Sequence, residues 1–131
     1  MNDEVVQPTG CPFCDIQRSH WTWHGAPLWK CFRDAYPVSE GHTLLVPHRH
    51  VASLFEITSG EWEELRIALD CTREELERMY GYTEFNVGVN VGAAAGQTVF
   101  HLHVHVIPRR EGDCESPRGG VRKVKPPLVE D

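Results

Sequence analysis

The sequence predicts an α+β domain, in which an antiparallel β-sheet packs with one long α-helix. Three observations lead to this class: two strand-like stretches come first, a single stretch with helical periodicity follows, and two more strand-like stretches come after it. With 131 residues, the chain is long enough to bury a core of its own. We therefore assign residues 1–131 to one domain, with a core over about 11–110 and a basic tail, rich in proline and glycine, over 111–131.

The N-terminal part of the chain is expected to form a short helix and then two paired strands. The helix is expected over Cys11–Ser19, and the strands over Leu28–Arg33 and His42–Pro47. Between the strands, Pro37–Gly41 predicts a turn, because proline presets a negative φ and glycine supplies a positive one. A short turn between two strands predicts an antiparallel pair, and Pro47 ends the second strand.

From Thr58 onward the pattern changes to a helical period. Thr58, with Glu61 three residues later, is a capping-box signature. One long amphipathic helix is expected from there to about Gly81. Its inward stripe recurs at steps of three and four residues: Trp62, Leu65, Leu69, Thr72, Leu76 and Met79. The acidic residues of this stretch mostly fall outside the stripe, and we expect them to form the solvated face of the helix.

Two stretches after the helix return to a period of two residues. They predict strands over Phe85–Asn90 and Val99–Pro108, joined through the small-residue run 92–96. In the second stretch, His101, His103 and His105 alternate with apolar residues, so the three histidines share one face of the strand. Three successive histidines are costly to bury without partners, and the row therefore predicts a functional site.

Composition excludes several classes of function. The net charge of −6 disfavours a binder of nucleic-acid polymers, which needs a basic surface. Residues 109–125 nevertheless hold six of the thirteen basic residues, a local excess that suits either a small polyanion or a solvated tail. No apolar run is long enough to span a bilayer, and residues 1–10 lack the features of a signal peptide, so we expect no membrane partner and a cytoplasmic location. Five irregularly spaced cysteines do not indicate a secreted disulfide framework.

Two chemistries explain a row of histidines on a strand. One is a zinc site that activates a bound water molecule. The other is nucleophilic catalysis, in which a neutral imidazole nitrogen attacks phosphorus. The segment just before the row favours the second, because the small-residue turn 92–96, the Gln97 amide and the Thr98 hydroxyl offer groups that suit phosphate oxygens.

This segment resembles the signature of the histidine-triad (HIT) family, His-φ-His-φ-His-φ-φ with φ apolar, which is commonly preceded by Gly-Gln-Ser/Thr-Val. The chain has Gly96-Gln97-Thr98-Val99-Phe100 and then the full triad. The similarity covers nearly the whole chain and includes these further stretches: 11–16, 32–34, 41–50 and 90–92. It implies a HIT-like fold: a meandering antiparallel sheet of about five strands, one long helix and a short N-terminal helix.

The resemblance also implies an activity. A HIT-type hydrolase cleaves a nucleoside phosphate or phosphoramidate at the α-phosphorus, through a nucleotidyl-histidine intermediate, and releases a nucleoside monophosphate. Pro108-Arg109-Arg110 is similar to the dinucleoside polyphosphate branch, including diadenosine polyphosphate hydrolases, and places the two arginines either at the distal phosphates or in solvent. A homodimer is implied as well. The alternatives are a nucleotidyltransferase or phosphorylase of the same family, and a nucleotide-binding regulatory module with little turnover.

Roles for individual residues follow from the same resemblance. His103 corresponds to the nucleophile, and its other ring nitrogen is expected to bond to an acceptor such as a main-chain carbonyl. His105, with Thr98 and Asn90, corresponds to the group that contacts the α-phosphate, and Gln97 belongs to the catalytic set. Asp34 corresponds to the position that binds the ribose hydroxyls. Phe32, together with Ile16, is placed either in the base pocket or in the core, and His42 matches a fourth family histidine without an assigned role.

The pair Cys11 and Cys14 has two interpretations. Cys-Pro-Phe-Cys is similar to the redox motif of glutaredoxins, but the first ten residues make a poor strand, which that fold needs before the motif. The spacing also suits two thiolates at adjacent corners of a zinc tetrahedron. Resemblance to bacterial HIT proteins implies the second pair of ligands, His50 and His101, and a structural rather than catalytic Zn²⁺.

Overall fold

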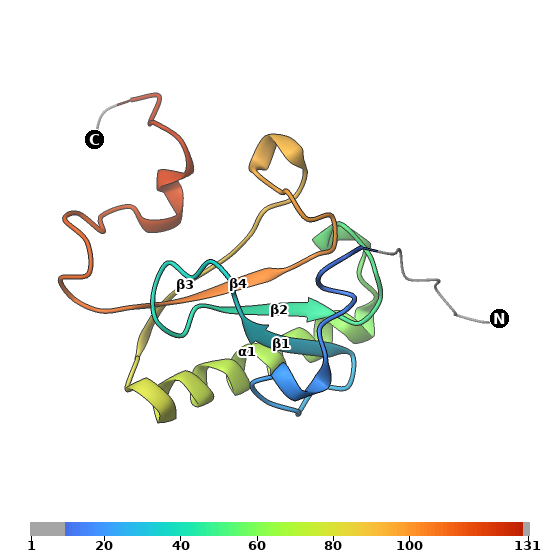
Figure 1. Ribbon diagram of the computed structural model, residues 1–131. Helices are drawn as coiled ribbons and strands as arrows, with labels where there is room; N and C mark the ends of the chain where they lie inside the picture. Colours follow the sequence, from blue (N-terminus) through green and yellow to red (C-terminus); the bar gives the residue numbers. More distant parts are fainter. Residues whose placement is uncertain (1–9, 130–131) are drawn as a thin grey trace.

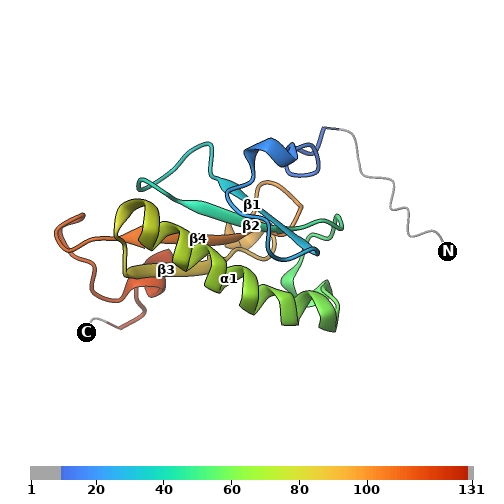
Figure 2. The same cartoon turned by 90° about the horizontal axis from the view of Figure 1, so that it is seen from below.

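The computed structural model describes residues 10–129, so the outermost residues of the predicted domain, 1–9 and 130–131, lie outside it. Four antiparallel strands form one sheet: β1 (Trp29–Arg33), β2 (Thr43–Pro47), β3 (Glu84–Val89) and β4 (Val104–Arg109). The long helix α1 (Ser59–Tyr80) connects β2 to β3 and lies across one face of the sheet (Figure 2). The predicted α+β class is confirmed.

The sheet differs from the expectation in strand number and order. The described residues form four strands rather than about five, and the order is β1-β2-β4-β3 (Figure 1). The chain therefore does not meander strictly from neighbour to neighbour, because β4 lies between β2 and the edge strand β3. The register pairs Leu44 with His105, and Gly88 with the same histidine from the other side. His105 thus lies in the middle of the sheet.

The predicted N-terminal helix Cys11–Ser19 is wrong. Residues 11–15 form turns, and only a short 3-10 helix, η1 (Arg18–His20), follows. The reason is local: the main-chain N–H of Cys14 donates to the Sγ of Cys11 at 3.4 Å instead of joining a helical ladder. The side chain of Lys30 likewise donates to the carbonyl of Cys14.

Helix α1 begins and ends as expected. Thr58 and Glu61 form a reciprocal capping box, and Gly81 closes the helix in the left-handed conformation with φ of 79°. Two members of the predicted inward stripe, Trp62 and Met79, are exposed. Three further 3-10 helices complete the described elements: η2 (Leu54–Glu56), η3 (Ala93–Ala95) and η4 (Gly120–Val124). Among residues 10–129, no helix is long and apolar enough to cross a membrane.

Two acids of α1 are buried rather than solvated. Glu75 is only 6% exposed and receives two hydrogen bonds from Arg33, at 2.8 and 2.9 Å. Glu61 is 2% exposed and receives two from Arg49, at 2.9 and 3.0 Å. A buried carboxylate requires such pairing, and the two bidentate pairs tie the helix to β1 and to the loop after β2.

The main core lies between α1 and one face of the sheet. Trp29, Leu45 and Val104 contribute from three strands, and Leu65 and Leu76 from the helix. Gly41 comes so close to this helix that an added Cβ would lie 2.9 Å from Leu76, which, with a φ of 92°, explains the glycine. The opposite face of the sheet does not contribute to this core.

A second, smaller apolar cluster covers part of that other face. Phe32, Leu44 and Val46 point away from α1, and Phe13 and Ile16 of the N-terminal segment pack on them. His105 lies on the same face, because it is paired directly with Leu44. We call this the open face, because α1, the one α-helix among residues 10–129, lies across the opposite face of the sheet (Figure 2).

Candidate active site

His103 lies just before β4 in a conformation that fixes its protonation. Strand β4 begins at Val104 rather than at the predicted Val99, because the chain at Leu102 donates instead to the carbonyl of Val51 at 2.7 Å. The side chains still alternate: Leu102 and Val104 are buried, whereas His103 is half-buried. Its Nδ1 lies 2.9 Å from the carbonyl oxygen of His101. Since a carbonyl can only accept, the neutral ring carries its proton on Nδ1 and its lone pair on Nε2.

His105 belongs to a chain of hydrogen bonds on the open face. The main-chain N–H of Val38 donates to Nδ1 of His42 at 3.2 Å, so the neutral His42 ring carries its proton on Nε2. That Nε2 lies 2.9 Å from Nδ1 of His105 and 3.4 Å from a carboxylate oxygen of Asp34. His105 therefore accepts through Nδ1, and its own proton is on Nε2, where it can be donated to a ligand.

The lowered pKa values of His42 and His105 keep both rings neutral near pH 7. Burial, together with the neighbouring His103 and His42, lowers the pKa of His105 to about 4, against the opposing effect of Asp34. Burial also lowers the pKa of His42, against the opposing effect of Asp34. Because the neutral His42 ring donates to Nδ1 of His105, the proton of the neutral His105 ring stays on Nε2. His105 is therefore a directed hydrogen-bond donor. Sequence reasoning gave His42 no role, because the N–H that fixes its tautomer comes from the turn before it.

Asp34, His42 and His105 also lie close enough together to be considered as metal ligands. The hydrogen bonds argue against that use. The single lone pair of the neutral His42 ring is already taken by Val38 N–H, and that of His105 by His42. Asp34 is partly occupied too, since one of its oxygens accepts from the N–H of Tyr36 at 2.9 Å. We interpret the group as a chain of donors and acceptors.

Aromatic side chains flank the histidines toward β1. The ring of Phe13 lies edge-on to His103, with centroids 4.9 Å apart, and 5.6 Å from the ring of Phe32. Ile16 packs on the same apolar cluster as Phe32, so the two residues expected either at a base pocket or in the core lie together on the open face. Phe13 was not anticipated, although it stands between the two cysteines and its place follows from theirs. These rings offer a flat apolar surface for a nucleobase.

The loop before the triad is held by Gln97. Its amide oxygen accepts from the N–H of Gly92 at 2.8 Å, and its amide nitrogen donates to the carbonyls of Ala52 and Val99. Gln97 is 4% exposed, and these bonds let it hold the shape of the loop; its place in the catalytic set stays a prediction. Thr98 is exposed and lines a hollow with Pro12 and His50, on the His101 side of the row. Asn90 lines a cleft together with His105.

Arg109 and Arg110 bond to protein groups. Arg109 donates to Asp113 at 2.7 and 2.8 Å, and to Asn86 at 2.6 Å. This hydrogen bonding lowers the pKa of Asp113 below its usual range. Arg110 donates to the carbonyl of Tyr80 and lies over the ring of Tyr82 at 4.2 Å. Arg110 is exposed to solvent, which is one of the two placements considered from the sequence, whereas Arg109 is half-buried. A place for either side chain at the distal phosphates stays a prediction.

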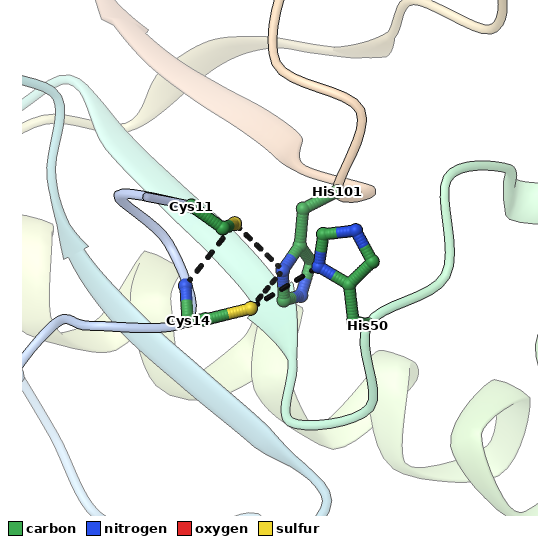
Figure 3. A group of neighbouring side chains, drawn as sticks. All are labelled: Cys11, Cys14, His50 and His101. Atoms are coloured by element: carbon green, nitrogen blue, oxygen red, sulfur yellow. Dashed lines mark hydrogen bonds between the residues drawn. The ribbon is translucent and has the colours of Figure 1, made fainter. Parts of the chain in front are cut away.

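The four predicted zinc ligands come together at one end of the sheet (Figure 3). The ligand atoms of Cys11, Cys14, His50 and His101 all lie within 4.8 Å of one another. The Sγ of Cys14 is 3.1 Å from Nδ1 of His50 and 3.4 Å from Nδ1 of His101, and the Sγ of Cys11 is 3.6 Å from the latter. The cluster brings together residues that are far apart in the sequence, since Cys11 and His101 are separated by 90 positions.

The donor set fits a tetrahedral zinc ion. Bond lengths of about 2.3 Å to sulfur and about 2.0 Å to nitrogen place neighbouring ligand atoms about 3.6 Å apart. His101 is prepared for this role, because its Nε2 lies 2.8 Å from the carbonyl of Pro47 and so carries the proton, leaving Nδ1 as the ligand atom. Burial lowers the pKa of His101 to about 4, which keeps the ring neutral. The N–H of Cys14 that donates to Cys11 also suits a thiolate.

Comparison with known proteins identifies the family. The family model described as HIT domain matches residues 25–112, so the chain belongs to the HIT family. Adenylylsulfatase HINT3 of Arabidopsis thaliana is 35% identical over 107 residues, which are 79% of this chain and 54% of that protein. The asymmetrical bis(5'-nucleosyl)-tetraphosphatase of Schizosaccharomyces pombe is 35% identical over 82 residues, 63% of this chain and 45% of that protein. The chain spans about half the length of these curated relatives.

A solved structure bears on the cysteine and histidine cluster. A zinc-bound histidine triad family protein from Mycobacterium smegmatis superimposes with a TM-score of 0.70 at 27% sequence identity, covering 88% of this chain and 87% of that one. The HIT-like fold is thereby confirmed. The zinc-bound relative and the cluster of Cys11, Cys14, His50 and His101 together support a metal site in this chain.

Proposed function

We propose that the protein is a nucleotide hydrolase that cleaves at the α-phosphorus of a dinucleoside polyphosphate, or of a related nucleoside phosphate or phosphoramidate. The single observation that carries the proposal is the 2.9 Å contact between Nδ1 of His103 and the His101 carbonyl. In the neutral ring this contact leaves the lone pair on Nε2, the tautomer that a nitrogen nucleophile requires. The names of the relatives, an adenylylsulfatase and a bis(5'-nucleosyl)-tetraphosphatase, support a nucleotide substrate.

In the first chemical step, Nε2 of His103 attacks the α-phosphorus. A nitrogen–phosphorus bond forms while the bond from phosphorus to the leaving group breaks, and the leaving group takes that electron pair. A phosphate leaves as the anion, whereas the nitrogen of a phosphoramidate also takes a proton from solvent and leaves as the neutral amine. Nε2–H of His105 donates to a phosphate oxygen and stabilises the charge that builds up there. His42 holds His105 in the donor tautomer through the 2.9 Å contact.

In the second step, water attacks the phosphorus of nucleotidyl-His103. The nitrogen–phosphorus bond breaks, its electron pair returns to Nε2, and the proton of the water is released to solvent. The product is a nucleoside monophosphate and the neutral His103 is restored. Asp34 is proposed to accept from the ribose hydroxyls, with Phe13, Ile16 and Phe32 against the base.

Cys11, Cys14, His50 and His101 are proposed to hold a structural Zn²⁺. Such an ion supplies a cross-link between the N-terminal segment and the start of the triad, and takes no part in the bond changes. The link has a consequence for the site, because Phe13 stands between the two cysteines and packs on His103. His101, one of the four proposed ligands, also orients His103 through its main-chain carbonyl.

We also propose that the chain acts as a homodimer in the cytoplasm. Large apolar side chains are exposed on α1 and on the edge strand β3, among them Trp62, Ile67 and Val87. Trp62 and Ile67 line one hollow on α1, and an exposed apolar patch is typical of a subunit contact. Free cysteines suit a reducing compartment. Sedimentation velocity of the wild-type protein and of Trp62→Glu tests the dimer. The proposed homodimer predicts that the variant sediments as a smaller species.

The activity is tested with diadenosine tetraphosphate and adenosine 5'-phosphoramidate as substrates. The wild-type protein is expected to release AMP from at least one of them, and His103→Ala to release none. His20→Ala, which changes an exposed histidine outside the site, is the matched control and should keep full activity. If neither substrate turns over while AMP still binds, the hydrolase proposal is wrong and a binding module remains.

A further inference from the structure

A second hollow lies apart from the candidate active site, between the segment 18–27 and the first residue of β1. Its volume is about 380 Å³, toward the lower end of the usual range for small-molecule sites. We call it the Trp21 pocket, and its lining includes Arg18, Trp21, His24, Pro27, Trp29 and His48. None of these six residues belongs to the proposed nucleotide or zinc sites, and none lines the cleft that contains His105.

Hydrogen bonds to the sheet hold the walls of the Trp21 pocket. The main-chain N–H of Thr22 donates to the carbonyl of Cys31 on β1 at 3.0 Å, and that of His48 donates to the carbonyl of Leu28 at 3.0 Å. Trp29 is 1% exposed, and its indole N–H donates at 2.9 Å to a main-chain carbonyl of α1. The pocket is therefore largely preformed, as small-molecule sites usually are.

Trp21 lies at the centre of a stack of flat groups. Its ring centroid is 5.2 Å from that of His24, with an interplanar angle of 32°, and 5.2 Å from that of His48. The guanidinium of Arg18 lies over the same indole ring, at 4.9 Å from the centroid. A pocket with such a lining suits a ligand that is itself flat and aromatic.

The charge of the lining favours an anionic ligand. Among residues 10–129, Arg18 is the one lysine or arginine that lines the pocket, and no carboxylate lines it. Stacking over an indole ring leaves the N–H groups at the edge of a guanidinium available, and their spacing matches the two oxygens of a carboxylate. A single guanidinium balances a single negative charge, which favours a carboxylate over a doubly charged phosphate.

The indole N–H of Trp21 points to an acceptor from outside the chain. Over residues 10–129, its Nε1 is the one buried side-chain nitrogen or oxygen without a hydrogen-bond partner. The neighbouring Trp23, in contrast, donates to the hydroxyl of Thr72 at 2.8 Å. A buried donor without a partner is rare and costly. Since this nitrogen exposes less than 1 Å², a ring beside it must shift on binding, and His24 is the exposed ring of the stack.

We propose that the Trp21 pocket is a second binding site, which takes an aromatic carboxylate. The ring of the ligand packs against Trp21 and His48, and its carboxylate accepts from the guanidinium of Arg18 and from the indole N–H of Trp21. The three supporting observations are the flat lining, the single cation without a facing acid, and the unpartnered N–H. The site does not depend on the proposed hydrolase chemistry.

Nuclear magnetic resonance tests the site directly, because each of the four tryptophans contributes one indole N–H signal. The probe is 2-naphthoate, added to the ¹⁵N-labelled wild-type protein with and without excess AMP. The signal of Trp21, identified by its absence from Trp21→Phe, is expected to move downfield as its N–H gains an acceptor. The signal of Trp62 on α1, outside the pocket, should stay in place. A Trp21 signal that does not move, or a shift that AMP abolishes, would overturn the proposal.

Calorimetry separates the contributions of charge and ring. Arg18→Gln and Trp21→Phe are each expected to weaken binding of 2-naphthoate about tenfold, because each removes a hydrogen bond to a charged group. Arg78→Gln changes an exposed arginine of α1 and is the matched control, which should bind as the wild type does. The uncharged 2-naphthamide should bind more weakly to the wild type and be insensitive to Arg18→Gln.

The outcomes decide the site without reference to turnover. Absence of 2-naphthoate binding at millimolar concentration, or an equal loss of affinity in Arg18→Gln and Arg78→Gln, would refute it. Failure of the hydrolase proposal leaves all of these readouts unchanged, so the two proposals are tested separately.

Discussion

Replacing His42 tests whether the chain of hydrogen bonds that ends at His105 contributes to catalysis. In the wild-type protein, Val38 N–H fixes Nδ1 of His42 as an acceptor at 3.2 Å, so the proton on Nε2 faces His105 at 2.9 Å. His42→Leu removes that donor and fills most of the buried volume. His105 is then free to carry its proton on Nδ1, and Nε2 loses its role as a donor to the phosphate.

The size of the effect follows from the hydrogen bond at stake. A hydrogen bond to a charged group contributes about 1.5–3 kcal/mol, and removing one donor from an oxyanion site costs about 2.7–4 kcal/mol. Since the substitution releases the tautomer of His105 without deleting the ring, we expect the lower range. A loss of about 1.5–3 kcal/mol corresponds to a fall in kcat/KM of about 10- to 150-fold.

The assay is AMP release from adenosine 5'-phosphoramidate, with thermal unfolding of each variant as the folding control. His42→Gln offers an amide N–H to His105 and is expected to lose less activity than His42→Leu. Two results would refute the reasoning: unchanged kcat/KM in His42→Leu, or an equal loss in both variants despite normal folding.

Three further predictions concern the metal, the pH dependence and the acceptor. Purified wild-type protein should contain about one zinc per chain. Cys14→Ser should lose the zinc and unfold at a lower temperature, whereas the control Cys71→Ser should keep it. Equal zinc contents in the two variants would contradict the assigned ligands. Burial raises the pKa of the Glu61 carboxyl, but the hydrogen bonds from Arg49 outweigh the effect of burial and hold this pKa below 4.5. The pair of Glu61 and Arg49 therefore stabilises the fold above pH 4.5, and its contribution disappears as the pH falls through the lowered pKa. Chemical denaturation between pH 6 and pH 3 should therefore show a shallower acid loss in Glu61→Gln; an identical slope would argue against the pair. Finally, adding inorganic phosphate to the diadenosine tetraphosphate assay should leave AMP as a product, and its replacement by ADP would identify a phosphorylase.

The parts of the fold that could be predicted from the sequence depend on local signals. Thr58 and Glu61 define the start of α1, and Gly81 its end, because capping acts within one turn. The alternation of histidines with Leu102, Val104 and Val106 gave the buried side correctly even though β4 begins later than expected. The metal cluster came from the family resemblance, since spacing alone does not identify His50 and His101.

The rest depends on contacts between distant residues. The burial of Glu75 follows from Arg33, which lies 42 positions earlier in the chain. The late start of β4 follows from the bond between Leu102 and Val51. Phe13 reaches His103 only because the cysteine turn is folded against His101. No periodicity in the sequence records these contacts, and they decide the geometry of the candidate site.

The central claim is that His103 carries the nucleotidyl group during turnover. Mixing the wild-type protein with diadenosine tetraphosphate, quenching within the first turnover in alkali and digesting the protein should yield a peptide with one added adenylyl group on His103, detected by mass spectrometry. Adenylyl-His103, absent from His103→Ala and present in His20→Ala, is the predicted result. AMP release at the normal rate by His103→Ala, or a label on His101 or His105 instead, would contradict the account.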